Sequence, residues 1–253
     1  KRSRDPGDSR QMVAARRRFL NAGFYQAIAT ATSEAVLADL PPRGTVSCLD
    51  AGCGEGYYLR QLAAANSDGQ TLVLLGLDIS KWAVLSAAKQ DRRPNWIVGS
   101  NANLPVQSGT LDWVLCLFGF PVYAEFNRVL KPDGQLLQLD AGPDHLRELR
   151  EIIYPSLKPE RAADVRDPQG FTSLSTETVH YPLQLLGPEP IADLLAMTPH
   201  LYRATAERRA AILALPLREE PEIDGERAIF DEAQAAVREG RRGQTTDEVL
   251  AAI

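Results

Sequence analysis

The segment from Leu49 to Tyr58 constrains the fold more than any other part of this 253-residue chain. It reads Leu-Asp-Ala-Gly-Cys-Gly-Glu-Gly-Tyr-Tyr, it follows the short run Val46–Cys48, and it precedes a helix-like stretch over 59–65. A strand, a glycine turn and a helix start therefore follow one another. Three glycines at alternate positions let a flat, adenosine-bearing ligand approach the backbone and permit positive φ at the turn. The segment predicts a site for a nucleotide-like cofactor.

An acidic residue closes the next apolar run and strengthens this prediction. Asp78 follows the run over 72–77. Its spacing from the glycine turn is that of the carboxylate which hydrogen-bonds ribose hydroxyls in nucleotide-binding folds. Asp78 could instead cap a helix that begins near Lys81.

Short apolar runs alternate with helical stretches along most of the chain. The predicted strands are residues 46–51, 72–77, 96–99, 113–117 and 135–139, and the predicted helices are residues 59–65, 81–89, 122–130 and 145–153. Near-continuous apolar strands between amphipathic helices are typical of a parallel sheet covered on both faces. We therefore predict an α/β fold with a doubly wound, mainly parallel sheet.

Further elements flank this pattern. Helices are expected over 12–20 and 25–40, a tight reversal over 131–134, a strand over 178–186 and a helix over 191–197. The chain then divides into three parts. These are a basic lead-in with helices (1–42), a cofactor-binding domain (43–215) and an acidic helical tail of unknown role (216–253).

Composition narrows the class of protein. Hydrophobic residues make up 44% of the chain, which suffices for a core, and no long apolar window or signal peptide is apparent, so we expect a cytoplasmic protein without a membrane partner. Cys48, Cys53 and Cys116 lack metal-ligand spacing and are expected to be reduced core thiols.

The net charge of −5 argues against a generally basic nucleic-acid binder. The first eighteen residues are nevertheless rich in Lys and Arg, which could hold phosphates or could form a solvated helix face.

Polar and aromatic side chains follow the predicted strands at the edge where a doubly wound sheet binds its ligand. Ser100, Asn101 and Asn103 follow the third strand, Phe118 to Pro121 follow the fourth, and Asp140, Asp144 and His145 follow the fifth. The amides could meet an adenine edge. These residues form neither a Ser/His/Asp set nor a phosphate-gripping loop nor a metal cluster, which disfavours hydrolysis and phosphoryl transfer.

Several segments together resemble a known family. Asp50 to Tyr58 with Gly76 to Lys81 look like a class I S-adenosylmethionine methyltransferase. The segments Arg2 to Ser9, Ala15 to Arg17 with Phe19-Leu20, Ala22 to Gln26, Gly142 to Leu149 and Met197 to Pro199 are similar to the bacterial 23S rRNA guanine-N1 methyltransferases, the RlmA family. The likeness covers roughly residues 1 to 212, and the lead-in and the Gly-Pro-x-His-Leu segment are its most specific parts.

The resemblance implies roles for individual residues. Gly54 and Glu55 would contact S-adenosylmethionine at the glycine turn, Tyr25 would reach it from the lead-in, His145 from beyond the fifth strand, and Asp78 would hold the ribose. The full expected cofactor site, from which S-adenosylhomocysteine leaves as product, comprises Tyr25, Asp50, Gly52, Gly54, Glu55, Gly56, Asp78, Ile79, Ser100, Asn101 and His145. Tyr25 could equally be a core aromatic, and His145 a structural residue at a helix start.

The sequence departs from the family at both ends. The family has a zinc-binding module with four cysteines ahead of the segment matching Lys1, so we expect zinc only if such a module exists. Such methyltransferases usually finish with an antiparallel strand. Residues 229–237 and 246–253 instead read as two short amphipathic helices joined by Gly240 to Gly243, forming either a peripheral appendage or a partner-binding element.

Methyl transfer requires alignment of donor and acceptor, and guanine N1 must also lose a proton. Asp140 is the first candidate for the proton acceptor and Asp144 the second, although either could cap the helix near His145. Phe118 and Phe120 could stack the target base, or could be core packing, and Arg16 and Arg17 could contact the RNA.

Three functions remain open from the sequence. The first is an rRNA guanine-N1 methyltransferase acting on a 23S rRNA hairpin or a ribosomal particle, with a homodimer possible. The second is a small-molecule methyltransferase, favoured by an enclosed acidic cavity. The third is a non-catalytic protein that binds the cofactor or a partner.

Overall fold

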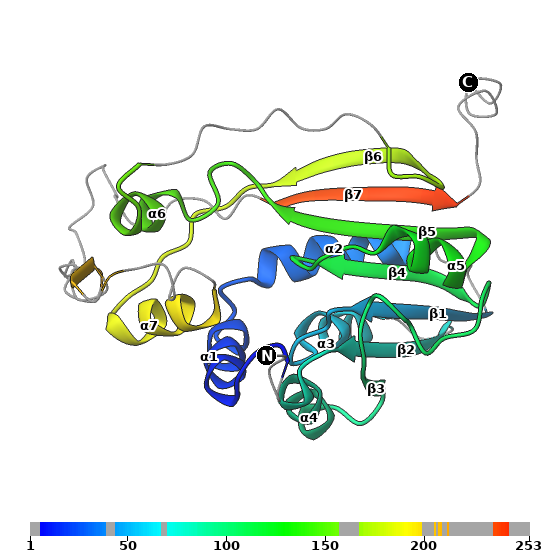
Figure 1. Cartoon of the computed structure of the whole chain (residues 1–253), viewed down its shortest axis with the longest axis horizontal. Helices are drawn as coiled ribbons and strands as arrows, with labels where there is room; N and C mark the ends of the chain where they lie inside the picture. Colours follow the sequence, from blue (N-terminus) through cyan, green and yellow to red (C-terminus); the bar gives the residue numbers. More distant parts are fainter. Residues whose placement is uncertain are drawn as a thin grey trace.

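The computed structural model describes residues 6–38, 44–66, 70–156, 167–198, 205, 207, 208 and 212, together with the backbone of 235–242. Its centre is a sheet with the strand order β3-β2-β1-β4-β5-β7-β6 (Figure 1). The parallel strands are β1 (Gly44–Ala51), β2 (Gln70–Asp78), β3 (Asn95–Val98), β4 (Leu111–Leu117) and β5 (Leu130–Ala141). β7 (Ala235–Arg242) runs antiparallel between β5 and the outermost strand, β6 (Phe171–Val179), which has the same direction as β5.

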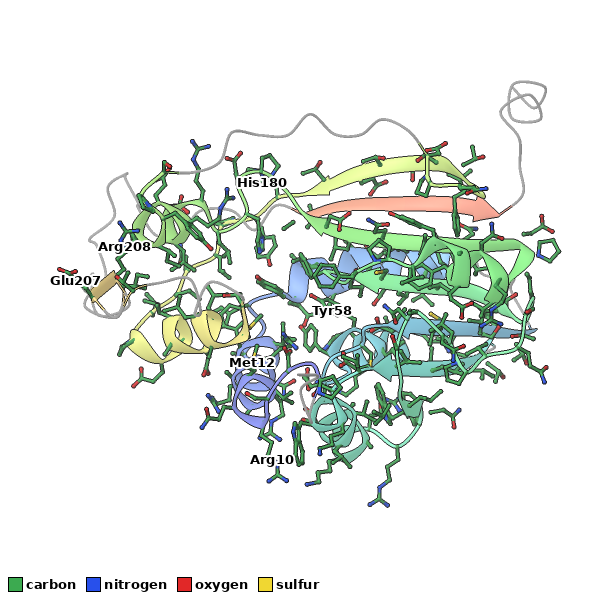
Figure 2. All side chains as sticks on the ribbon, viewed as in Figure 1. Arg10, Met12, Tyr58, His180, Glu207 and Arg208 are labelled. Atoms are coloured by element: carbon green, nitrogen blue, oxygen red, sulfur yellow. The ribbon has the colours of Figure 1, made fainter. Side chains whose placement is uncertain are left out.

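Helices alternate with these strands, as the sequence predicts. Their bounds are α1 (Arg10–Asn21), α2 (Gln26–Ala38), α3 (Tyr57–Ala65), α4 (Lys81–Gln90), α5 (Tyr123–Val129), α6 (Arg147–Ile153) and α7 (Pro188–Met197). The predicted α/β class and the mainly parallel sheet are confirmed. Figure 2 shows Arg10 at the outer edge of the molecule at the start of α1, whereas Tyr58 of α3 lies in the interior.

The sheet is buried on both faces because successive strand residues point to opposite sides. Cys48 packs in a core with α1, α2, α3, α6 and α7, and the next residue, Leu49, packs in a second core with Phe126 of α5. In β4, Trp113 likewise packs in the first core and the next residue, Val114, packs in the second. This two-sided burial explains the near-continuous apolar runs in the sequence. The three cysteines are buried and free, as expected.

The tail differs from the prediction where the structure describes it. Residues 235–237, expected to end a helix, and Gly240 to Arg242, expected to connect two helices, lie in β7 between β5 and β6. The expected absence of a final antiparallel strand is therefore wrong. The remainder of the two predicted helices falls outside the described residues. Local sequence cannot reveal such a strand, because its backbone hydrogen bonds are supplied by partners more than fifty residues away.

Two smaller predictions also need correction. The strand expected over 178–186 begins and ends earlier, as β6. The residues Lys131 to Gly134, expected to form a tight reversal, lie within β5. Pairing with β4 jumps from Leu130 to Gln135, so these four residues form an irregularity in the strand.

Candidate functional site

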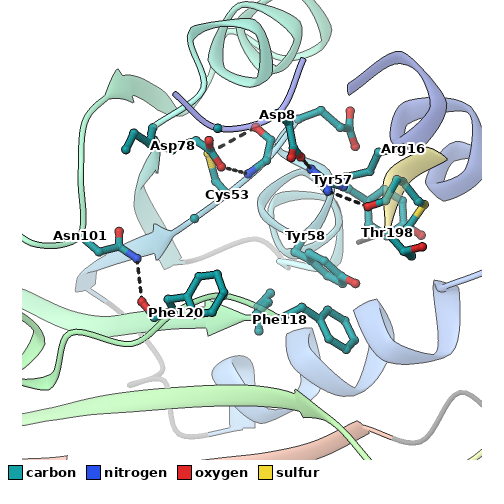
Figure 3. Close-up of a pocket in the computed structure, with 18 of the residues that line it drawn as sticks. Asp8, Arg16, Cys53, Tyr57, Tyr58, Asp78, Asn101, Phe118, Phe120 and Thr198 are labelled. Atoms are coloured by element: carbon teal, nitrogen blue, oxygen red, sulfur yellow. Dashed lines mark hydrogen bonds and ion pairs between the residues drawn. The ribbon is translucent and has the colours of Figure 1, made fainter. Parts of the chain in front are cut away.

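A cavity of about 780 Å³ lies where the carboxyl ends of β1, β2, β4 and β5 meet the lead-in (Figure 3). This size is within the range of small-molecule sites. The sequence-predicted residues that line it are Arg16, Tyr25, Gly52, Gly54, Glu55, Asp78, Ile79, Ser100, Asn101, Phe118, Phe120, Asp140 and His145. The topology thus gathers residues from several separate segments into one space.

The glycine turn forms one wall of the cavity. Gly54 has φ +54°, and a side chain there would stand 3.6 Å from Arg16 Nη1. Gly56 has φ +81°, and its Cβ would come within 2.4 Å of the Trp96 ring. Gly54 therefore keeps the cavity wall free of side chains, whereas Gly56, which does not line the cavity, allows α3 to pack against the sheet.

Asp78 is held at the end of β2 by backbone donors. Its Oδ2 accepts the Gly54 N–H at 2.9 Å and its Oδ1 accepts the Ser80 N–H at 2.7 Å. Desolvation raises the pKa of this carboxyl, and the two backbone hydrogen bonds oppose that rise. The side-chain cap of α4 is Ser80, whose Oγ accepts the Ala83 N–H at 3.3 Å. Asp78 is therefore aligned at the cavity wall and does not cap α4 with its side chain.

Asp50 lies beneath the same turn but does not line the cavity. It is 1% exposed, and neither carboxylate oxygen has a hydrogen-bond partner among the described residues. Desolvation, and then the charge of Asp78, raise the pKa of Asp50 to about 8. A buried carboxylate of this kind is costly when ionised, so Asp50 keeps its proton near neutral pH.

Glu55 uses its side chain for structure. Its carboxylate pairs with Arg60 at 3.0 Å and accepts a hydrogen bond from Gln90. Its backbone carbonyl oxygen also accepts hydrogen bonds, from Arg60 at 2.8 Å and from Gln90 at 3.3 Å. At another wall, Asn101 Nδ2 donates to the carbonyl oxygens of Ala51 at 3.2 Å and Phe120 at 3.4 Å, which ties the loop after β3 to the loop after β4 (Figure 3).

Aromatic rings form the opposite wall. The Phe118 ring lies 6.0 Å from Tyr25 and 5.8 Å from His145, and the Tyr25 and His145 rings are 6.3 Å apart. Phe118 has φ +54°, a strained conformation for a residue other than glycine, and strain of this kind gathers at functional sites. Burial raises the pKa of the Tyr25 phenol well above its ordinary value, so it stays protonated. Phe120 is 90% exposed at the rim, which is not core packing.

Asp140 is oriented by a chain of hydrogen bonds from β5 and α5. Tyr123 donates its hydroxyl to Gln138 Oε1 at 2.8 Å, and Gln138 Nε2 donates to Asp140 Oδ2 at 2.6 Å. Gln138 is buried, so its amide has little freedom to turn. The other oxygen, Asp140 Oδ1, has no hydrogen-bond donor among the described residues and remains available to a ligand.

Besides Asp50 and Gly56, two more predicted site residues, Asp144 and Arg17, lie outside the cavity wall. Asp144 forms an ion pair with Arg147 at 2.6 Å, and its backbone carbonyl accepts the Arg147 N–H at the start of α6. Arg17 is exposed on α1. Neither lines the cavity. The geometry therefore separates Asp140 from Asp144 as candidates for chemistry.

The cavity also includes residues that the site prediction missed. Asp8 forms an ion pair with Arg16, and Arg16 Nη2 donates to the Met197 carbonyl at 3.1 Å, which joins the lead-in to the end of α7 (Figure 3). Tyr58 and Thr198 also line the space. Asp8 and the Met197 to Pro199 segment belong to the family-like motifs, which were the available signal. Nothing local marks Tyr58 beyond its place after the glycine turn.

Residues 48–134 match the family model described as a methyltransferase domain. A solved structure, the YcgJ protein of Bacillus subtilis, shares the fold with a TM-score of 0.55 at 17% identity, covering 85% of this chain and 100% of that chain. Fold, glycine turn and strand-end acid together define a class I, S-adenosylmethionine-dependent methyltransferase.

Curated relatives narrow the family. The Bacillus subtilis protein named "Putative 23S rRNA (guanine-N(1)-)-methyltransferase YxjB" is 30% identical over 78% of this chain and 72% of its own length. A protein of the same description from Micromonospora griseorubida is 33% identical over 82% of this chain and 75% of its own. The chain belongs to this 23S rRNA (guanine-N1-)methyltransferase family. A malonyl-[acyl-carrier protein] O-methyltransferase of Laribacter hongkongensis is 31% identical over 53% of this chain and 54% of its own length.

Metal-binding clusters and membrane-spanning helices are both absent from the described part of the chain. No group of three or more His, Cys, Asp or Glu side chains there could hold a metal ion. No described helix has both the length and the apolar character needed to cross a bilayer.

Proposed function

We propose that this protein transfers the methyl group of S-adenosylmethionine to N1 of a guanine in 23S rRNA. The observation that carries the proposal is the presence of Asp140 in the same cavity as the glycine turn and Asp78. Family membership supports the class of substrate. The cavity therefore supplies both a cofactor half and a half suited to proton removal from an acceptor.

The cofactor half fits an adenosyl sulfonium. Asp78 would accept hydrogen bonds from the ribose hydroxyls, and Ser100 and Asn101 would meet the adenine edge. Gly52, where an added Cβ would meet nothing within 4 Å, leaves room for close approach to the backbone. Tyr25, Phe118 and His145 would face the positively charged end, because aromatic faces attract cations. When bound, this cofactor supplies a methyl group on a positively charged sulfur that a nucleophile can displace.

The acceptor half must orient the base and take one proton. Asp140 Oδ1 would accept the N1 proton of guanine, while Gln138 holds the other carboxylate oxygen in place. Phe118 and the exposed Phe120 would stack a base that has left its helix. The chain would thus contribute alignment, base stacking and a proton acceptor, while N1 of guanine would bond to the methyl carbon as the bond from that carbon to the cofactor sulfur breaks.

The direct test is methylation of 23S rRNA transcripts with radiolabelled S-adenosylmethionine, followed by nuclease digestion and nucleoside separation. We expect label in 1-methylguanosine. The Asp140→Asn variant serves as the matched control, because it keeps the shape of the side chain and removes the acceptor charge. Label in another nucleoside, or none in RNA, would reject the guanine-N1 assignment.

A second candidate follows from the malonyl-[acyl-carrier protein] O-methyltransferase relative. An O-methyltransferase acting on a carboxylate needs no proton acceptor, because its acceptor is already ionised. The same labelled cofactor offered with malonyl-loaded carrier protein tests this candidate. Methyl ester formation that survives Asp140→Asn, with no label in RNA, would favour it.

A further inference from the structure

The packed pair α1 and α4 carries a concentration of positive charge that is unusual for this chain. The α1 sequence contains four arginines and the α4 sequence two lysines, and neither contains an Asp or Glu. The whole chain has a net charge of −5. Acidic residues therefore predominate in the rest of the sequence, whereas the α1 and α4 sequences carry positive charge only.

Part of this charge is already used inside the molecule. Arg16 pairs with Asp8, and Arg18 pairs with Asp193 of α7. The same two helices also carry four exposed cationic residues, which are Arg10, Arg17, Lys81 and Lys89. We call these four residues, together with Trp82, the α1–α4 basic face.

An aromatic ring lies among these cations. The Arg10 guanidinium carbon is 3.7 Å from the centre of the Trp82 ring, and Lys81 Nζ is 4.6 Å from it. Cation–π contacts of this kind hold a guanidinium in a fixed place while its N–H groups stay available. Arg17 lies two turns beyond Arg10 on the same side of α1. Figure 2 shows Arg10 projecting beside α4 at the edge of the molecule.

The basic face starts at the rim of the cavity. Gly7 and Asp8 line the cavity immediately before α1, and Ile79 lines it immediately before α4. Ser80 Oγ donates to the Asp8 carbonyl at 2.7 Å, which fixes the two helix starts together. At the far ends, Asn21 Nδ2 donates to Gln90 Oε1 at 3.2 Å, so the two helices run side by side. A ligand whose reacting part enters the cavity could therefore extend along this face.

We propose that the α1–α4 basic face binds the phosphate backbone of the RNA that flanks the target nucleotide. The inference rests on the proposed function, because it supplies the docking surface for that substrate. Guanidinium and ammonium groups around an aromatic ring suit phosphates and unpaired bases, whereas a carboxylate partner gains nothing from the ring. RNA is therefore favoured over an acidic protein.

The test compares neutralising variants on the face with a matched variant away from it. Arg10→Gln and Lys81→Gln, singly and together, remove charge from the face, and Trp82→Leu removes the ring. Lys131→Gln, at the start of β5, is the control for removal of one cation. Nitrocellulose filter binding of labelled 23S rRNA transcript is measured over a salt series, and calorimetry with S-adenosylhomocysteine checks the cofactor half in each protein.

We expect the double variant to weaken RNA binding by about tenfold or more. The slope of log affinity against log salt should fall by about one for each phosphate that is no longer neutralised. Trp82→Leu should weaken binding about threefold to tenfold. Lys131→Gln should bind as the unaltered protein does. Affinity for S-adenosylhomocysteine should be unchanged in every variant, which also shows that each is folded.

RNA affinity and salt slope that stay unchanged in the double variant would overturn the proposal. The proposal would also be overturned if the double variant bound RNA normally but no longer transferred methyl to an acidic carrier protein. Binding and methylation are measured separately, so the two inferences can fail separately. Normal RNA binding without 1-methylguanosine would reject the proposed function and leave the docking surface standing.

Discussion

The two halves of the cavity are built in different ways. The cofactor half is made largely from backbone: a glycine turn with positive φ, and Asp78 held by the N–H groups of Gly54 and Ser80. The acceptor half is made from side chains on separate elements, namely Phe118, Phe120 and the chain from Tyr123 through Gln138 to Asp140. Backbone construction belongs to the fold class, whereas side-chain construction can change with the substrate. Substitutions should therefore affect the two halves independently.

The sharpest way to separate the halves is Asp140→Asn. Loss of a proton acceptor should lower kcat for methyl transfer to RNA by about 10²- to 10⁴-fold. The dissociation constant of S-adenosylhomocysteine should stay within about twofold, because calorimetry reports only the backbone-built half. Equal losses in both quantities would show that the division is wrong.

The reverse experiment alters the cofactor half. Asp78→Asn keeps the size of the side chain but removes the charge-assisted hydrogen bonds expected with the ribose, which are worth about 1.5–3 kcal/mol in total. Calorimetry should show cofactor affinity weakened by about ten- to a hundredfold. At saturating cofactor, kcat should fall much less than in Asp140→Asn, and a comparable fall would contradict the comparison.

A third prediction concerns stability and its dependence on pH. The folded-state pKa of Asp50 is about 8, above its ordinary value of 3.8, so the folded protein retains a proton that the unfolded chain has lost. The contribution of Asp50 to the free energy of unfolding therefore falls as pH rises from about 4 toward 8. Asp50→Asn should not show this loss, because the asparagine amide does not titrate in this pH range. In the cofactor-free protein, the thermal midpoint of Asp50→Asn should exceed that of the unaltered protein by a difference that grows between pH 5 and pH 8. The corresponding difference in the free energy of unfolding should grow by about 1–3 kcal/mol over this range. A constant difference would show that Asp50 does not titrate in this way.

The smallest expected effect tests the orientation of Asp140. Tyr123→Phe removes the hydroxyl that fixes the Gln138 amide, at a cost of about 1 kcal/mol. We expect kcat to fall about fivefold and the thermal midpoint to fall by about 2–4 °C, with the KM for cofactor nearly unchanged. Phe126→Leu, a core change in the same helix, is the control: it should lower the midpoint and leave kcat for the folded enzyme intact.

The difference between the backbone-built cofactor half and the side-chain-built acceptor half also explains which parts of the site could be predicted from the sequence. The glycine turn and Asp78 are close in sequence and obey backbone rules, so their positions could be predicted from spacing. Asp140 and Phe118 could be expected at the strand ends, but the link through Gln138 to Tyr123 depends on how α5 packs. Asp144, four residues after Asp140, lies outside the cavity wall, three residues before α6 begins, and pairs with Arg147. β7 escaped prediction because its pairing partners are distant in the chain.

The position of β7 has a consequence for how the chain acquires its structure. β6, at residues 171–179, is hydrogen-bonded in the sheet only to β7 among the described strands, and β7 arrives more than fifty residues later. During synthesis, β6 and the edge of β5 that faces it have no strand to pair with until β7 has been made. A ribosome-bound intermediate therefore exposes open strand edges, which invite pairing with other chains. Completion of the sheet beside β5 is therefore a late, long-range event.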